Sequence, residues 1–253
     1  MGLAADQLVL AQLAVPQAKY ADRERQLQLL DEVVAALERA PGIDGATPVN
    51  APPFAGTGRL GCAEIHRGGS ERRTSATNSS LNLESVHPNY FATLGVVLLR
   101  GRAFTPHDRP GAPHVVIVSE DVAARTWPGE DAIGKRVKLG GVHSREPWRE
   151  VVGIARRTRY RELRDPRATL YLSASQFPFE PNMIVLRTGS PTGAVAALVR
   201  DRVRTVDPAV EVMRIARFAE LLEGPLARPR FNAFLIGYSA WRRGGWPRSG
   251  CTR

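Results

Sequence analysis

Apolar residues recur along the chain with two different periods, and each change of period marks the edge of a predicted element. Residues 8–15 form a nearly unbroken apolar run, which predicts a buried strand. Across residues 23–39 the apolar positions recur at three- and four-residue steps, which predicts an amphipathic helix with Asp22 as its N-cap. A Pro-Gly pair ends this helix, and residues 43–49 predict a second, weaker strand. The segment is therefore a strand–helix–strand unit.

A second unit of the same kind lies near the other end of the chain. It consists of a predicted strand at residues 183–187, a helix at residues 191–206 and a strand at residues 210–215. Pro191 suits the first turn of the helix, because proline needs no hydrogen-bond acceptor there. One face of this helix is apolar and carries Val195, Leu198, Val199, Val203 and Val206.

The chain between the two units is rich in predicted strands. Residues 51–80 are polar and rich in Gly, Ser, Thr and Arg, so they predict a loop, with a possible hairpin that includes residues 63–66. Strands are predicted at residues 114–118, 137–139, 148–154 and 169–172, and a short helix capped by Ser119 is predicted at residues 120–126. No crossover helix in this portion is long enough for a parallel sheet.

Residues 82–108 form the stretch around which the rest is organised. Alternating apolar and polar residues predict a strand that ends at Val86. Tyr90, Phe91 and Leu94 then recur at helical spacing until Gly95, after which a further strand begins. These three apolar residues are interpreted as core residues at the junction of two lobes.

The motif V-x-P-x-Y-F-x-x-L-G-x-x-L-L-x-G-R-x-F-T at residues 86–105 resembles the extracytoplasmic core domain of MacB-like ABC-transporter permeases, also called FtsX-like permeases. Residues 115–137 and 226–237 are similar to the same family, and the resemblance covers most of the chain as far as Gly237. It implies a porter-like lobe of βαβ units and a second small lobe. The pattern and the resemblance therefore agree on the fold class α+β, with two βαβ-type units forming a porter-like lobe and a strand-rich lobe inserted between them.

The predicted domain boundaries follow this division. The porter-like lobe comprises residues 1–85 and 182–226, the inserted lobe comprises residues 86–181, and residues 227–253 begin a membrane helix that is truncated or frame-shifted. The resemblance implies that helix after residues 231–237, yet residues 238–253 hold two tryptophans and four arginines without periodicity. We interpret this tail as a reading-frame slip, because a shifted frame of residues 245–253 can encode an apolar run. A truncation at the front is equally plausible, since the family places a membrane helix before the first strand.

Composition and charge narrow the function classes. The chain has 253 residues, 43% of them apolar, which is typical of a folded protein. Its net charge is +10, but the basic residues are nearly all arginines, scattered and without aromatic neighbours, so nucleic-acid binding is disfavoured. Cys62 and Cys251 are too few for a disulfide framework or a metal cluster. As written, the chain shows no signal peptide and no run of eighteen apolar residues.

Two groups of residues could carry chemistry, and both are interpreted as structural. Residues 129–136, G-E-D-A-I-G-K-R, nearly match a phosphate-binding loop, but Arg136 replaces the magnesium-binding hydroxyl and two acidic residues stand where phosphates would lie. They are taken as a surface turn. His87 and His107 beside Asp108 suggest acid–base catalysis without a nucleophile, and all five histidines, His66, His87, His107, His114 and His143, are taken as solvated loop residues. No catalytic, cofactor-binding or metal-binding residue is predicted.

The resemblance implies a non-catalytic domain on the extracytoplasmic face of the cell (inner) membrane. It would couple ATP hydrolysis in a separate domain to substrate export or partner signalling, through the segments at Leu8 and residues 226–237. The implied partners are an ABC nucleotide-binding domain and permease membrane helices, with a second permease copy or a periplasmic adaptor as further candidates, and no nucleic acid. The alternatives are a free-standing binding module with a ligand between the lobes, or a small hydrolase, for which the sequence shows no catalytic cluster.

Overall fold

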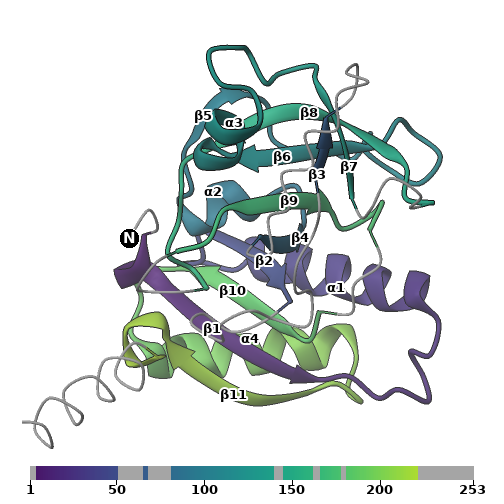
Figure 1. The fold of residues 1–253 in the computed structure, drawn as a ribbon. Coiled ribbons are helices and arrows are strands. Elements are labelled where there is room, and N and C mark those ends of the chain that lie inside the picture. The colour runs from purple at the N-terminus through teal and green to yellow at the C-terminus, as the bar shows by residue number, and fades with distance from the viewer. Residues whose placement is uncertain are drawn as a thin grey trace, which may run out of the picture.

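The computed structural model describes residues 4–50, 65–67, 81–139, 145–161, 166–177 and 181–221. These residues form two β-sheets with a small number of helices (Figure 1). The fold is thus mixed α and β, as the sequence predicts.

The first sheet has four strands in the order β11-β1-β10-β2, and all neighbours are antiparallel. Its strands are β1 (Leu8–Ala14), β2 (Gly45–Val49), β10 (Met183–Arg187) and β11 (Glu211–Arg217). Helix α1 (Arg23–Glu38) joins β1 to β2, and α4 (Thr192–Val206) joins β10 to β11. Each helix therefore links two strands that run in the same direction with one strand between them, which is the split βαβ arrangement. Both predicted βαβ-type units are confirmed.

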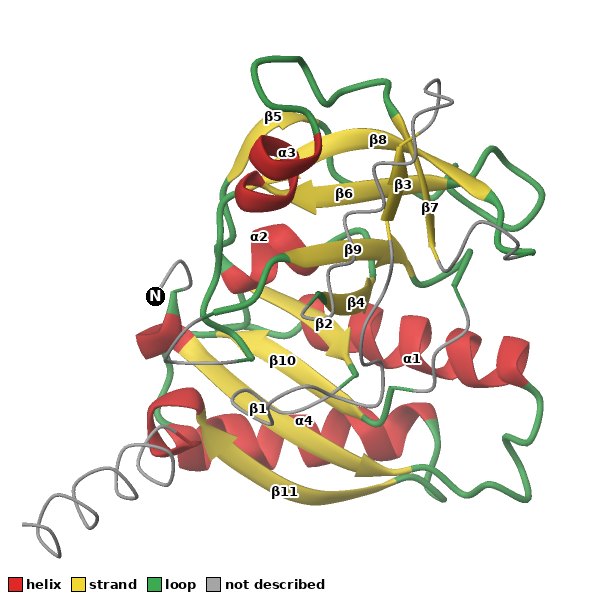
Figure 2. Cartoon of the chain, viewed as in Figure 1, coloured by secondary structure: helices red, strands yellow, loops and turns green. Residues whose placement is uncertain are grey.

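Helices α1 and α4 cover one face of the first sheet (Figure 2). The core on this side combines alternate residues of β1 with the apolar stripes of both helices. It includes Val9, Ala11, Leu13, Leu30, Val33, Leu37, Val195, Val199 and Val203, all fully buried. The Asp22 carboxylate accepts a hydrogen bond from the Glu24 backbone N–H at 3.3 Å, so the predicted N-cap is present.

The second sheet is built entirely from the chain between β2 and β10. Its main order is β3-β7-β8-β6-β9-β4, and β5 pairs with β8 outside that order. The strands are β3 (Ile65–Arg67), β4 (Asn82–Val86), β5 (Leu98–Gly101), β6 (Val115–Ser119), β7 (Arg136–Leu139), β8 (Trp148–Ala155) and β9 (Thr169–Ser173). Three short helices complete the described fold: η1 (Ala5–Gln7), α2 (Tyr90–Leu94) and α3 (Glu120–Thr126).

The expectation that this portion contains no parallel pairing is wrong. Strands β4 and β9 are parallel, and so are β6 and β8. A parallel pair needs a long connection rather than a long helix. The connection from β6 to β8, residues 120–147, includes the short α3 and the strand β7, which is long enough to return the chain to the starting edge.

Ser119 stands at the predicted N-cap position of α3, but its side chain makes no cap hydrogen bond. Its hydroxyl accepts a hydrogen bond from the Thr169 backbone N–H at 2.9 Å and donates one to the Asp121 carboxylate. The neighbouring strand β9 competes for this buried hydroxyl, so Ser119 links α3 to the sheet.

Two further expectations fall partly or wholly on residues that the structure does not describe. Strand β3 pairs with β7, while the remainder of the possible hairpin around it lies outside the described residues. Residues 226–237 and the tail at 238–253 also lie outside them. Among the residues that the structure describes, no helix is both long and apolar enough to cross a membrane.

Candidate functional site

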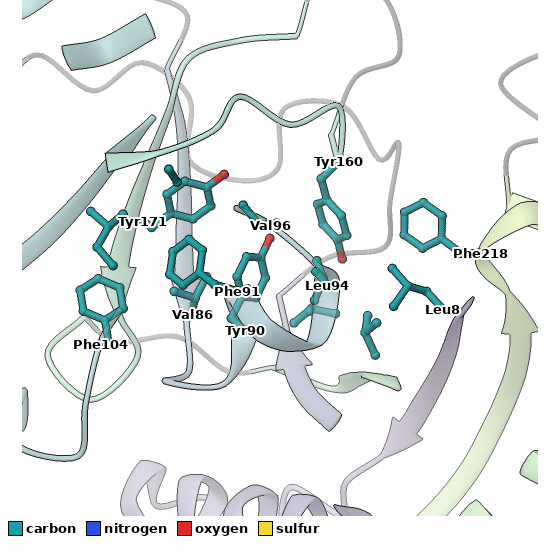
Figure 3. Close-up of a cluster of buried hydrophobic side chains, with 14 of the residues drawn as sticks. Leu8, Val86, Tyr90, Phe91, Leu94, Val96, Phe104, Tyr160, Tyr171 and Phe218 are labelled. Atoms are coloured by element: carbon teal, nitrogen blue, oxygen red, sulfur yellow. The ribbon is translucent and has the colours of Figure 1, made fainter. Parts of the chain in front are cut away.

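One apolar cluster contains residues of both sheets, and we call it the junction core (Figure 3). It lies on the face of the first sheet opposite α1 and α4, because Leu8 and Leu10 alternate along β1 with residues of the helix-side core. Its buried members are Ala5, Leu8, Leu10, Val49, Val86, Tyr90, Phe91, Leu94, Val96, Phe104, Val115, Ile117, Ala155, Tyr160, Tyr171, Val185 and Phe218. The sequence-based interpretation of Tyr90, Phe91 and Leu94 as core residues at a junction is therefore confirmed.

Aromatic rings dominate the centre of the junction core. The Phe91 ring meets Tyr171 edge-on, with centroids 5.1 Å apart, and meets Tyr90 edge-on at 5.5 Å. Such edge-to-face pairs are the preferred geometry of buried rings. Burial raises the pKa of Tyr90, Tyr160 and Tyr171, so all three hydroxyls remain protonated at ordinary pH.

Gly95 ends helix α2 and turns the chain toward β5. Its φ of 72° lies in the left-handed region, and the Val96 N–H bonds the Phe91 carbonyl at 2.9 Å. A Cβ at this position would lie 2.5 Å from Nη2 of Arg187 and 3.1 Å from Cβ of Ala4. The Leu-Gly pair of the motif thus allows α2, β10 and the first described residues of the chain to approach one another.

Both ends of the described chain contact the junction core. The Ala4 N–H donates a hydrogen bond to the Leu94 carbonyl at 3.0 Å, and Leu8 lies fully buried in the core. At the other end Phe218, directly after β11, stacks obliquely on Tyr160 with centroids 6.0 Å apart. Figure 3 shows Leu8 and Phe218 on the same side of the cluster, next to Leu94 and Tyr160.

The Gly-Arg-x-Phe-Thr part of the motif closes a loop after β5. The Arg102 guanidinium holds the Asp108 carboxylate with two hydrogen bonds of 2.8 and 2.9 Å, and the Thr105 N–H adds one of 2.8 Å. Burial would raise the pKa of Asp108, but the bonds from Arg102 and Thr105 outweigh it, so this pKa is lowered. The closed loop directs Phe104 into the junction core.

A buried ion pair lies beside the aromatic rings. The Arg161 guanidinium donates to both Glu84 carboxylate oxygens, with Nη2 to Oε2 at 2.9 Å, and both side chains are more than nine-tenths buried. Burial alone would lower the pKa of Arg161, but Glu84 more than compensates and the pKa is raised. A cavity of about 10 Å³ adjoins the pair and is lined in part by Tyr90, Thr158 and Tyr171. It has room for a single water molecule.

Comparison with known proteins gives the family. The family description that matches residues 4–207 is the MacB-like periplasmic core domain. The chain belongs to this family. It is thus an extracytoplasmic domain of MacB/FtsX-like ABC-transporter permeases.

Solved structures support the same fold. The periplasmic region of MacB from Actinobacillus actinomycetemcomitans aligns with a TM-score of 0.55 at 15% identity, covering 88% of this chain and 94% of that one. A domain of a putative permease protein from Porphyromonas gingivalis aligns with a TM-score of 0.50 at 14% identity, covering 84% and 91%. No curated protein matches the chain.

The structure shows where four of the five histidines of this MacB-like domain lie. His107 is exposed, while Asp108 is occupied by Arg102. His87 is buried and its Nδ1 lies 3.6 Å from the Asp31 carboxylate on α1, so its interpretation as a solvated residue is wrong. The reason is its place between β4 and α2, directly against α1. His114 is half-buried, His66 lies in β3, and His143 is outside the described residues.

The segment that resembles a phosphate-binding loop is a surface turn. Gly129 and Gly134 have φ angles of 75° and 77°. The Lys135 ammonium binds Glu130 at 2.9 Å, and Asp131 binds Arg100 at 2.7 Å. The lysine that would have to reach a phosphate is therefore engaged with the acidic residue of its own turn. No cluster of three metal-ligating side chains occurs within the described residues.

Sequence reasoning missed both ion pairs of the site. Arg161 follows Glu84 by 77 residues, and no spacing rule connects positions so far apart. Arg102 and Asp108 are six residues apart, and the adjacent turn residues could have suggested their pairing. Glu84 offered a weaker signal, namely a carboxylate within a predicted strand.

Proposed function

We propose that this domain is a non-catalytic mechanical element of an ABC-transporter permease. It would couple conformational change driven by ATP hydrolysis to substrate export or to signalling outside the membrane. The observation that carries the proposal is that residues at both ends of the described chain, Leu8 and Phe218, share one buried core with the inserted sheet. Any displacement of those ends acts directly on both sheets.

The packing of the junction core supports a particular kind of motion. A close-packed core transmits small displacements, because its side chains have no free volume in which to absorb them. Three apolar residues of α2, Tyr90, Phe91 and Leu94, are buried between the first sheet and the second sheet. The two sheets would therefore shift together as one rigid body, driven by the segments before Leu8 and after Phe218.

The proposal includes partners and a location. The domain would work with an ABC nucleotide-binding domain and permease membrane helices at the extracytoplasmic face of the cell membrane, with a second permease copy or a periplasmic adaptor as further partners. We also propose the division into a porter-like lobe and an inserted lobe. Because β3 and β4 belong to the second sheet, we would begin the inserted lobe before Ile65 rather than at Val86.

The non-catalytic part of the proposal is supported by the state of two buried acids at the junction core. Glu84 and Asp108 are each held by an arginine, so neither is available as a general acid or base. The cavity beside Glu84 and Arg161, at about 10 Å³, is far below the ~300 Å³ of a small-molecule site. This cavity therefore lends no support to a binding module with a ligand between the lobes.

A disulfide staple tests whether the sheets move as one body. A Cβ on Gly45 of β2 would lie 3.6 Å from Cβ of Thr93 on α2, within the usual disulfide range of roughly 3.5–4.5 Å. The Gly45→Cys/Thr93→Cys pair, with Cys62 and Cys251 changed to serine, is placed in the reconstituted permease complex. We expect the ATP hydrolysis rate of the oxidised complex to equal that of the reduced one.

A second arm tests whether the chain end transmits force. A flexible Gly-Ser insertion directly before Ala4 should change the hydrolysis rate several-fold, because a flexible segment would absorb a displacement before it reaches the domain. If the domain were an inert appendage, neither the staple nor the insertion would change the ATP hydrolysis rate. If the sheets instead moved about a hinge, oxidation of the staple would slow ATP hydrolysis and a reductant would restore the rate. Either result would contradict the proposal.

A further inference from the structure

Trp148, the first residue of β8, is a large aromatic side chain with 43% of its surface exposed. It lies opposite Lys138 of β7 in the antiparallel register, and the Lys138 ammonium stands 5.9 Å from the ring centroid. Alternation along the strands puts Arg136 and Glu150 on the same outward face, one pair further along. This face, defined by Arg136, Lys138, Trp148 and Glu150, is called the outer β7–β8 face.

The backbone that carries Trp148 is firmly held. The next residue, Arg149, points inward and is almost fully buried. Its guanidinium donates to the Glu146 carboxylate at 2.8 Å and to the Pro147 carbonyl at 3.1 Å, and it packs over the Phe177 ring at 5.8 Å. Trp148 is thus an exposed ring on a strand fixed from behind, which limits the entropy lost when a partner binds.

The outer β7–β8 face lies away from the chain ends. The other end of β8, Ala155, pairs with Leu98 of β5, close to Leu94 and Ala4. Seven residue steps separate Trp148 from Ala155, which corresponds to about 23 Å along a strand. Figure 1 shows β7 and the start of β8 on the side opposite the N-terminus. In a permease attached through its chain ends, this face would point away from the attachment.

The charge of the face indicates the chemistry of a partner. Glu150 lies directly opposite Arg136 in the register, so these two charges offset each other. Among the described residues, Lys138 contacts the Trp148 ring and forms no ion pair with a carboxylate. The face therefore combines an exposed aromatic ring with an unbalanced positive charge, and tryptophan is one of the residues that most often anchor protein interfaces.

We propose that the outer β7–β8 face docks an extracytoplasmic protein that presents an acidic side chain beside an apolar one. The apolar side chain would cover the Trp148 ring, and the carboxylate would bind Lys138. This inference rests on the proposed function for the direction in which the face points, and it gives the predicted adaptor-type partner a specific surface.

The test uses the purified full chain and two synthetic probes. One is a fluorescein-labelled peptide of repeated Asp-Leu pairs, and the other is its twin with Lys in place of Asp. Fluorescence polarisation should show the acidic peptide binding to the wild type and at least about tenfold more weakly to Trp148→Ala. Lys138→Glu should lose the acidic peptide and gain the basic one. Met213→Ala is the matched control, because Met213 is also exposed but lies on β11 of the first sheet.

Three outcomes would overturn the inference. The acidic peptide could fail to bind the wild type at millimolar concentration, or it could bind Trp148→Ala as well as the wild type. Alternatively, vesicles of phosphatidylglycerol could bind the chain through Trp148 better than the peptide does, which would make the face a membrane surface. All three outcomes are independent of the staple experiment, because neither Gly45 nor Thr93 belongs to the outer β7–β8 face. Failure of this inference is therefore separate from failure of the proposed function.

Discussion

Glu84 and Arg161 show how single residues shape the junction. The Glu84 carboxylate lies buried in β4, a strand with almost no exposed face, and among the described residues its charge is balanced by Arg161 in the segment after β8. Taking both charges out of water costs free energy that their attraction repays only when geometry and hydrogen bonding are good. We therefore interpret the pair as fixing the position of β4 against the segment after β8 rather than as a source of net stability.

This interpretation predicts a non-additive pattern of mutations. Arg161→Met leaves the Glu84 carboxylate buried and unpaired, so we expect it to lower the free energy of unfolding by about 3–5 kcal/mol, and Glu84→Leu to have a similar effect. The double variant should lie within about 1–2 kcal/mol of the wild type, because no charge remains unpaired. Urea unfolding of the four proteins measures the cycle, and a double variant as unstable as the sum of the singles would refute the interpretation.

Sequence reasoning predicts contacts between residues that are near in the chain, but not contacts such as that of Glu84 with a residue far along it. Tyr90, Phe91 and Leu94 were predicted as core residues, because their helical spacing depends only on neighbours along the chain. The partner of Glu84 could not be predicted, because it depends on how β4 and the segment after β8 meet in space. Ser119 illustrates the same point, since a local cap rule was overridden by an N–H of the neighbouring strand β9.

At the scale of elements, period and turn residues located most helices and strands within a few residues. The order of strands in the second sheet was a different matter. Parallel pairing of β6 with β8 arises from a connection made of α3 and β7 together, and no periodicity within one segment contains that information. Strands β5 and β8 approach each other closely where two glycines meet, because Gly101 of β5 lies opposite Gly153 of β8.

We therefore expect the stability of the protein to be sensitive to any side chain added at Gly101 of β5. Its φ is 74°, and an added Cβ would overlap the Val152 carbonyl oxygen and lie 2.8 Å from Cα of Gly153. Gly111 has a φ of 83° with open space around the Cβ position, which makes Gly111→Ala a matched control for backbone strain alone. Gly111→Ala should cost about 1–2 kcal/mol of unfolding free energy.

Gly101→Ala should lower the free energy of unfolding by ~1–3 kcal/mol more than Gly111→Ala does, because β5 must move away from β8. Thermal unfolding followed by circular dichroism compares the two variants. If Gly101→Ala and Gly111→Ala lowered stability equally, the close approach of β5 to β8 would not contribute to stability.

At the scale of the whole molecule, one apolar core unites two sheets that are built from different parts of the chain. The split βαβ sheet contributes β1 and β10, the inserted sheet contributes β4, β6 and β9, and α2 lies between them. Residues from both ends of the described chain join the same core. This arrangement is consistent with the role that we propose for this member of the MacB-like family, which is to pass on a displacement.

The central claim is that the domain stands on the extracytoplasmic side of a membrane, and cysteine labelling in intact cells tests it most directly. Met213 is 65% exposed, so Met213→Cys in a Cys62→Ser/Cys251→Ser background gives one accessible thiol, while Val118→Cys is a buried control. We expect a membrane-impermeant maleimide to label Met213→Cys in spheroplasts as strongly as in lysed cells and to leave Val118→Cys unlabelled in both. Labelling of Met213→Cys only after lysis would place the domain inside the cell and contradict the account.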